Sequence, residues 1–297
     1  MTRLDFGEDL AATYAARLSD AQTRVPRDPG APLTEAAIAH LPAPMQRWLR
    51  RSGAVGQPPL RCLHIVYDAT MHQRPGGKGI AGTAEQFDTV VAPMRRLFYM
   101  PAKMFGVPMA VLHDYDAGEA SMQVRVARVL EVADEHGEAL ARTETVTLLN
   151  DLAFWAPSSL VGPACAWRAI DDRRSEVSFV LGPHAVRAAL VVDDAGDLVD
   201  FRSDDRGRVQ KDGTFRLEPW STPMRSHRAV GSRRVPWEGD AIWHTAEGDF
   251  VYGRFVVRSI TFDLEAPLQQ DARADPSAAP GTQPTRAAAS SPPHGSA

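Results

Sequence analysis

Arg61-Cys-Leu-His-Ile-Val-Tyr-Asp-Ala-Thr-Met71 carries the clearest structural signal in this chain. Apolar side chains stand at every second position, and more polar residues separate them: Leu63, Ile65, Tyr67, Ala69 and Met71. Successive side chains of a strand point to opposite faces, so this spacing predicts a strand with one buried face. Apolar or alternating runs recur at 124–130 and 186–192. Turn signals separate the runs, at Pro75-Gly-Gly77, Asp116-Ala-Gly118, Glu135-His-Gly137 and Asp193-Asp-Ala-Gly196. The pattern predicts an antiparallel meander.

Helical spacing appears before this strand. Residues 4–18 place four apolar side chains on one helical face: Leu4, Leu10, Tyr14 and Leu18. A Pro-rich connector at 25–32 leads to a second predicted helix, which contains Trp48 and stops near Gly53. We expect both helices to cover a sheet.

A third helix interrupts the strands between Thr143 and Trp155. Its apolar residues fit one helical face: Val146, Leu149, Leu152 and Ala153. Pro157 ends it, because proline removes a backbone donor and clashes with the preceding turn. We expect this helix to lie across a curved sheet. The fold class is therefore α+β and rich in strands, with a curved antiparallel meander sheet, shaped like a half-barrel, and covering helices.

Three segments follow from this organisation. Residues 1–30 form the N-terminal helix and its connector, and residues 31–265 form the strand-rich domain. Residues 266–297 are rich in Ala, Pro, Ser and Gly without an apolar period. Such a composition cannot bury enough apolar surface to fold, so we expect a disordered tail.

Composition excludes several classes of protein. The 33 basic and 37 acidic residues are interspersed and give a formal net charge of −4, which disfavours nucleic acid as a partner. No run of about 18 apolar residues predicts a membrane span, and no secretory signal is recognisable, so we expect a cytoplasmic protein. Cys62 and Cys165 do not form a disulfide framework, and we expect them to be buried as small apolar side chains.

Short motifs give little support for a cofactor or metal. Gly77-Lys-Gly-Ile-Ala-Gly82 matches a dinucleotide-binding pattern, but a predicted strand follows it where that chemistry needs a helix. Cys62 and His64 share one strand face, but the remaining histidines are scattered. His113-Asp114-Tyr115 is typical of a hydrogen-bonded strand end. We expect no cofactor and no metal.

Polar candidates for a ligand site fall at two places. Asn150 and Asp151 lie on the interrupting helix, whereas the others lie at or just after a strand: Arg202, Asp204, Asp205 and Arg206. Folding can bring the two groups together. Asp carboxylates then act as bases or bind a cation, and Arg206 holds an anion with two hydrogen bonds. The structural alternative is that these residues cap turns and that Asp205 and Arg206 pair to pin a loop.

Large aromatic side chains supply the apolar candidates. Trp155, Trp220 and Trp243 each offer a broad apolar surface with one indole donor, suited to a core or to a ligand cavity. The concave face of a curved sheet must be filled by side chains or by a ligand.

Several blocks of sequence resemble a bacterial family known only as a domain of unknown function. They are Glu144-Thr-Val-Thr-Leu-Leu-Asn-Asp151, Phe201-Arg-Ser-Asp-Asp-Arg206 and Trp220-Ser-Thr-Pro223. The resemblance covers roughly residues 40 to 263 and implies a curved sheet similar to the half-barrels of lipoprotein carriers. Many members of that family carry membrane-spanning segments before the domain, which we do not find in this sequence. No catalytic residue and no substrate can be transferred from the family.

Three functions remain open at this stage. The leading hypothesis is a protein that binds an apolar or amphipathic small molecule in the concavity of its sheet. One alternative is an enzyme that uses Asp151, Asp204 or Asp205 as an acid–base or cation-binding group and Arg206 as an anion anchor. The other is a protein-interaction module that uses a sheet edge or the tail.

The first prediction concerns the tail. A chain ending at Glu265 should unfold at nearly the same temperature as the full chain, because residues 266–297 cannot offset their ordering entropy by burial. Thermal unfolding followed by circular dichroism tests this. A large fall in melting temperature would show that the tail docks.

Overall fold

One antiparallel sheet organises the molecule. The computed structural model describes residues 9–127, 130–209 and 214–264. Six strands pair in chain order from the centre of the sheet to one edge: β1 (Cys62–Met71), β2 (Ile80–Thr89), β3 (Arg95–Met104), β4 (Val107–Asp116), β5 (Glu119–Val126) and β6 (Leu130–His136). This half is the expected meander.

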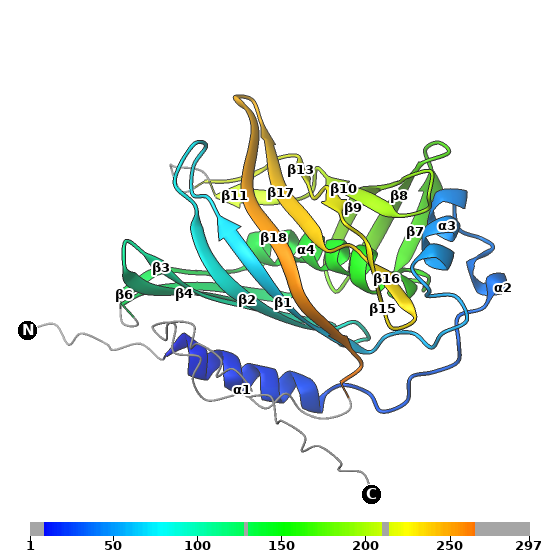
Figure 1. Cartoon of the computed structure of the whole chain (residues 1–297), viewed down its shortest axis with the longest axis horizontal. Helices are drawn as coiled ribbons and strands as arrows, with labels where there is room; N and C mark the ends of the chain where they lie inside the picture. The colour runs from blue at the N-terminus through cyan, green and yellow to red at the C-terminus, as the bar shows by residue number, and fades with distance from the viewer. Residues whose placement is uncertain (1–8, 128–129, 210–213, 265–297) are drawn as a thin grey trace, which may run out of the picture. The chain divides into compact units, whose positions relative to one another are not determined.

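The second half of the sheet lies on the other side of β1. β18 (Gly248–Phe262) pairs antiparallel with β1 and places Phe262 opposite Leu63. From β18 the order continues to the other edge through β17 (Glu238–Thr245), β13 (Trp220–Ser221), β10 (Leu198–Ser203), β9 (His184–Val192), β8 (Arg174–Leu181) and β7 (Cys165–Ala169). β14 (Met224–Arg225) also pairs with β17, and two separate hairpins are β11 (Gly207–Val209) with β12 (Phe215–Leu217) and β15 (Arg228–Val230) with β16 (Arg233–Val235). Figure 1 shows that the sheet is strongly curved, which confirms the α+β, strand-rich prediction.

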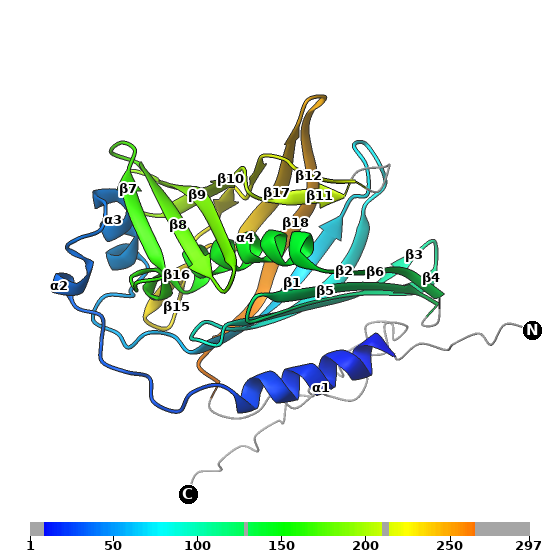
Figure 2. The same ribbon diagram turned by 180° about the vertical axis from the view of Figure 1, so that it is seen from behind.

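Helix α4 (Glu138–Trp155) lies across the hollow face of the sheet (Figure 2). It follows the edge strand β6 and, through the short helix η1 (Pro157–Leu160), precedes the opposite edge strand β7. Gly137 turns the chain out of β6 with a φ of 103°, a conformation that favours glycine. The chain must return from one edge of the sheet to the other at this point, and α4 makes that return across the hollow face.

Helix α4 is almost completely buried. Fifteen of its 18 residues are buried, including six polar ones: Thr143, Glu144, Thr145, Thr147, Asn150 and Asp151. The three threonine hydroxyls each donate to the backbone carbonyl four residues earlier. The glutamate, asparagine and aspartate cannot satisfy themselves in this way and need partners from the sheet.

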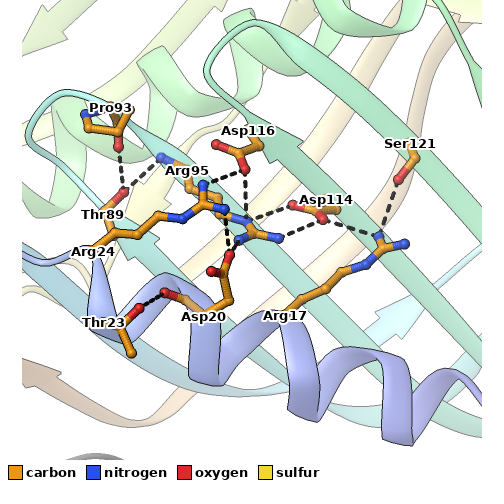
Figure 3. Close-up of polar contacts among 10 residues, drawn as sticks. All are labelled: Arg17, Asp20, Thr23, Arg24, Thr89, Pro93, Arg95, Asp114, Asp116 and Ser121. Carbon is orange, nitrogen blue, oxygen red and sulfur yellow. Dashed lines mark hydrogen bonds and ion pairs between the residues drawn. The ribbon is translucent and has the colours of Figure 1, made fainter.

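Helix α1 (Leu10–Thr23) packs on the outer face of the sheet, against β2, β3 and β4. Its apolar face is buried, and a cluster of ion pairs fixes its polar side, as Figure 3 shows. Arg95 is central to that cluster, since it donates to both carboxylate oxygens of Asp114, at 3.0 and 2.9 Å, and to Asp20 at 2.7 Å. These ion pairs thus attach α1 to β3 and β4.

Helix α3 (Ala43–Arg51) supports the C-terminal end of α4. It follows the single turn α2 (Glu35–Ile38) and ends before Gly53, as the sequence predicts. Trp48 is fully buried, and its indole Nε1 donates to the carbonyl of Ala153 at 2.8 Å. That carbonyl lacks its usual helical partner because Pro157, four residues later, has no N–H. The indole therefore satisfies an acceptor that the proline leaves open.

Some sequence-based boundaries differ from the structure. The helix expected over 4–18 begins at Leu10 and continues to Thr23, and residues 1–8 lie outside the described residues. The helix expected from Thr143 begins five residues earlier, at Glu138. The run 124–130 is not one strand, because β5 ends at Val126 and Ala127 has a positive φ. The predicted tail, 266–297, also lies outside the described residues.

The second prediction tests the support of α4 by α3. Trp48→Phe keeps most of the apolar volume but removes the indole donor, so we expect a loss of about 1–3 kcal/mol in the free energy of unfolding. Urea unfolding gives this quantity. Trp237→Phe is the matched control, because no hydrogen bond from the Trp237 indole occurs within the described ranges. Equal losses in both variants would contradict the role of the Trp48 bond.

Candidate functional site

A cavity, here termed the chamber, lies between α4 and the hollow face of the sheet. It contains about 850 Å³ of empty space, including the part that opens to solvent. Its walls come from α4, from β1 to β4, from β13, β14, β17 and β18, and from the loop after β10.

One wall of the chamber is apolar. Its side chains come from β1, β14, β18 and the end of α4, and they are Tyr67, Met71, Met224, Phe255, Val257 and Trp155. Tyr67 and Phe255 pack edge to face, with ring centroids 5.7 Å apart. We term these six residues the apolar wall.

Another part of the chamber wall is charged, and its charged groups hydrogen-bond to one another. Arg96 on β3 donates from Nε to Asp151 Oδ2 at 2.7 Å and from Nη1 to Glu144 Oε2 at 3.4 Å. Its Nη2 donates to Gln86 Oε1 at 3.2 Å. Gln86 Nε2 in turn donates to Asp151 at 2.9 Å and to Asp88 at 2.7 Å. This buried network, termed the Arg96 network, ties α4 to β2 and β3.

Burial and charge shift the pKa values within this network in opposite directions. Burial alone would raise the pKa of Glu144, but the neighbouring His113, Arg96 and Arg206 lower it to about 2. Burial and the nearby carboxylate of Asp151 raise the pKa of Asp88 well above its usual range, more strongly than Arg96 lowers it. Burial also raises the pKa of Asp151, although Arg96 and Gln86 favour its ionised form. Glu144 is thus ionised, whereas Asp88 favours its protonated form.

Arg206 lies against the aromatic end of the chamber. Its guanidinium carbon is 4.4 Å from the ring centre of Trp220, 4.9 Å from that of Trp243 and 5.9 Å from that of Tyr252. Nε donates to Thr147 Oγ1 at 3.3 Å, and Nη1 donates to the Tyr252 hydroxyl at 3.1 Å. Trp243 and Tyr252 are themselves stacked, at 5.7 Å between ring centres. We term this arrangement the Arg206 cage.

The structure brings five of the nine predicted site residues to the chamber. They are Asn150, Asp151, Trp155, Arg206 and Trp220. Asn150 reaches from α4 to the hydroxyl of Thr222, to which its amide donates. Trp243 is buried behind the cage and supports Arg206.

The other three predicted residues lie outside the chamber. Asp205 does not pair with Arg206. Its carboxylate instead accepts from Arg142 Nη2 at 2.6 Å and from the backbone N–H of Arg187 at 2.7 Å, so it pins its loop to α4 and β9. Arg202 pairs with Asp200, and Asp204 is exposed. The expected Asp205–Arg206 pair is therefore wrong, because adjacent side chains leave the loop in different directions.

Several residues at the chamber were not predicted from sequence: Arg96, Gln86, Glu144, Tyr67 and Tyr252. The sequence contains a signal for one of them, Glu144. Glu144, Thr147 and Asp151 recur at spacings of three and four in an otherwise apolar helix, so they share one face. No local pattern marks Arg96 or Gln86, because each lies in an ordinary strand.

A second polar chain occurs on β13, β17 and β18. Ser221 Oγ lies 2.8 Å from His244 Nε2, and His244 Nδ1 lies 2.7 Å from Asp249 Oδ1. The order of groups is that of a nucleophile, base and acid. However, Ser221 is only 2% exposed and pairs with strands on both sides, and none of the three lines the chamber. We interpret the chain as a link between strands.

Metal and membrane signals are weak within the described ranges. These residues contain no group of three or more His, Cys, Asp or Glu side chains placed to hold a metal ion. Cys62 and Cys165 are both free. Cys62 is buried as expected, whereas Cys165 is only half-buried. No helix in the described part of the chain is long and apolar enough to cross a membrane.

Comparison with known proteins identifies one family. The family of unknown function DUF6544 matches residues 31–255, about three quarters of the chain. No curated protein matches. Similar solved structures include a DUF1329 family protein from Desulfovibrio piger, with 10% identity over 75% of this chain and 93% of that one and a TM-score of 0.41. A LolA superfamily protein from Nitrosomonas europaea has 9% identity over 73% of this chain and 92% of that one, also with a TM-score of 0.41.

The third prediction uses Asp88. Above pH about 3.9 the unfolded chain releases this proton while the folded protein retains it, because its folded pKa is raised. The stabilisation that protonated Asp88 gives the fold is therefore complete below pH about 3.9 and is lost as the pH rises towards the folded pKa. Asp88→Asn carries no such proton, so we expect it to be more stable than the wild type at pH 7, with a gap that closes towards pH 4.

Urea unfolding between pH 4 and 8 measures this gap. The pKa of Glu144 is lowered to about 2, so its contribution to stability has the opposite pH dependence and changes mainly below pH 4. Asp204→Asn, at an exposed position, is the control. A difference between wild type and Asp88→Asn that does not change with pH would contradict the protonated state of Asp88.

Proposed function

This chain belongs to DUF6544, a family of unknown function, and we propose that it binds an apolar or amphipathic small molecule in the chamber. The observation that carries the proposal is the contrast between the two walls. The apolar wall presents six large side chains to one cavity, while the charged groups of the Arg96 network hydrogen-bond to one another. A site with large apolar surfaces and a few placed polar groups is typical of small-molecule binding.

The positions of the carboxylates support binding more than catalysis. The enzyme alternative uses Asp151, Asp204 or Asp205 as an acid–base group. Asp151 is held by Arg96 and Gln86, Asp205 is held by Arg142, and Asp204 lies on the surface outside the chamber. A general base must reach the proton that it removes, and here Asp151 Oδ2 and both oxygens of Asp205 already accept hydrogen bonds from the protein.

The fourth prediction fills the chamber. Ala241 lines it, so Ala241→Phe should exclude a ligand by occupying its space. Titration with the neutral fluorescent dye N-phenyl-1-naphthylamine should give saturable binding to the wild type and an affinity at least about tenfold weaker for the variant. The matched control is Ala166→Phe, on the exposed side of β7, which should bind like the wild type.

Two results would contradict the proposal. One is the absence of saturable dye binding to the wild type. The other is equal affinity in Ala241→Phe, shown by circular dichroism to be folded. Should that variant unfold, Met224→Trp fills the same cavity from a half-buried position on β14 and is expected to weaken binding in the same way.

A further inference from the structure

We infer that the ligand of the chamber is an anionic amphiphile, whose negatively charged oxygen headgroup is bound by Arg206 and Tyr252 while its tail lies along the apolar wall. The inference rests on the proposed function, since it names the class of molecule that the same chamber takes.

The positive charge of Arg206 has no ionic partner among the described residues. Among the described residues, no carboxylate lies within ion-pair distance of its guanidinium, whereas Arg96 and Arg142 each have one at 2.7 Å or less. The partners of Arg206 are the hydroxyls of Thr147 and Tyr252, which carry no charge. Glu144 acts on Arg206 only from beyond that distance. A guanidinium therefore faces the chamber with its positive charge unpaired.

Arg206 also has hydrogen-bond donors that the described residues do not use. A guanidinium has five N–H groups, and two of those on Arg206 are used, on Nε and Nη1. The remaining three, one on Nη1 and two on Nη2, have no acceptor in the part of the chain that the structure describes. They point to a ligand that brings acceptors of its own.

Tyr252 adds a further donor at the same place. Its hydroxyl oxygen accepts from Arg206 Nη1 and also from the indole Nε1 of Trp220, both at 3.1 Å. With its oxygen accepting twice, the hydroxyl hydrogen must point elsewhere, and the described residues offer it no acceptor. Arg206 and Tyr252 thus form a group of donors without an acceptor, on the wall of a cavity.

The aromatic rings hold the guanidinium in place. Its carbon lies 4.4 Å from the ring centre of Trp220 and 4.9 Å from that of Trp243, and both side chains are buried. Such contacts stabilise the cation and fix its plane while leaving its edge free for a planar oxygen group. A fixed guanidinium loses little side-chain freedom when an anion binds, which favours charge-assisted hydrogen bonds to carboxylate or phosphate.

The chamber also separates headgroup from tail. Thr147, which contacts Arg206, and Trp155 on the apolar wall are eight residues apart on α4, or about 12 Å along the helix. On β18, Tyr252 belongs to the Arg206 cage and Val257 belongs to the apolar wall. The cavity therefore offers a cation with free donors at one place and an apolar surface at another. Glu238 and Asp240, which also line the chamber, are paired with Arg225.

Four probes with the same twelve-carbon tail test the headgroup: dodecanoate, dodecyl phosphate, dodecanol and dodecylammonium. Each is titrated below its micelle concentration against the protein loaded with N-phenyl-1-naphthylamine. We expect both anions to displace the dye at least about tenfold more tightly than dodecanol, and dodecylammonium to be the weakest. Comparison of the two anions distinguishes carboxylate from phosphate as the preferred headgroup.

Variants test whether the Arg206 cage causes the preference for anionic headgroups. Arg206→Met should lose the advantage of the anions, about tenfold, and bind dodecanol within about twofold of the wild type. Tyr252→Phe should weaken the anions by a smaller factor. Arg202→Met is the matched control, because it removes the same charge from the neighbouring strand outside the chamber and should leave all four affinities unchanged.

The outcomes separate the two proposals. Equal binding of dodecanol and both anions to the wild type overturns the headgroup assignment and leaves small-molecule binding in place. Failure of every probe and of the dye overturns the proposed function itself. Should Arg206→Met unfold, the wild-type comparison and Tyr252→Phe still decide, since anion selectivity that survives loss of the Tyr252 hydroxyl in full contradicts its role as a donor.

Discussion

The ion pairs that Arg96 makes with Asp151 and Glu144 hold the centre of this structure together. They join α4 to the sheet where three charged groups are out of water, at 2.7 and 3.4 Å. Burying such charges is unfavourable, and removing one partner of a buried pair costs about 3–5 kcal/mol because the other is left uncompensated. The position of α4 in the hollow of the sheet depends on this network as much as on apolar packing.

That constraint also shapes the chamber. Because the Arg96 guanidinium pairs with Asp151 and Glu144, these groups hydrogen-bond to one another rather than to a ligand. The apolar wall and the Arg206 cage line the same cavity. The carboxylates of the Arg96 network have a cationic partner, whereas the Arg206 guanidinium has no carboxylate within ion-pair distance among the described residues. This asymmetry is the physical basis of both proposals, since it gives the cavity an apolar surface and one cationic anchor.

Local patterns predicted much of the fold. The alternation in 61–71 became β1, the spacing around Trp48 became α3, and the apolar period near 146–153 became α4. These features follow from spacing along the chain, which a sequence displays directly. The site was harder to predict. Asp205 and Arg206 are neighbours in sequence, yet the first binds Arg142 and the second enters the aromatic cage.

The sequence by itself determined the strand-rich α+β class, the helix that interrupts the strands, and the aromatic and polar residues from which a site could be built. Only the tertiary structure decided which of them meet. β18 pairs with β1, and α4 crosses from one sheet edge to the other, so residues such as Arg96, Asp151 and Tyr252 come together from distant parts of the chain. Such contacts depend on strand order and on the curvature of the sheet, which arise from packing of the whole domain and leave no local pattern in the sequence.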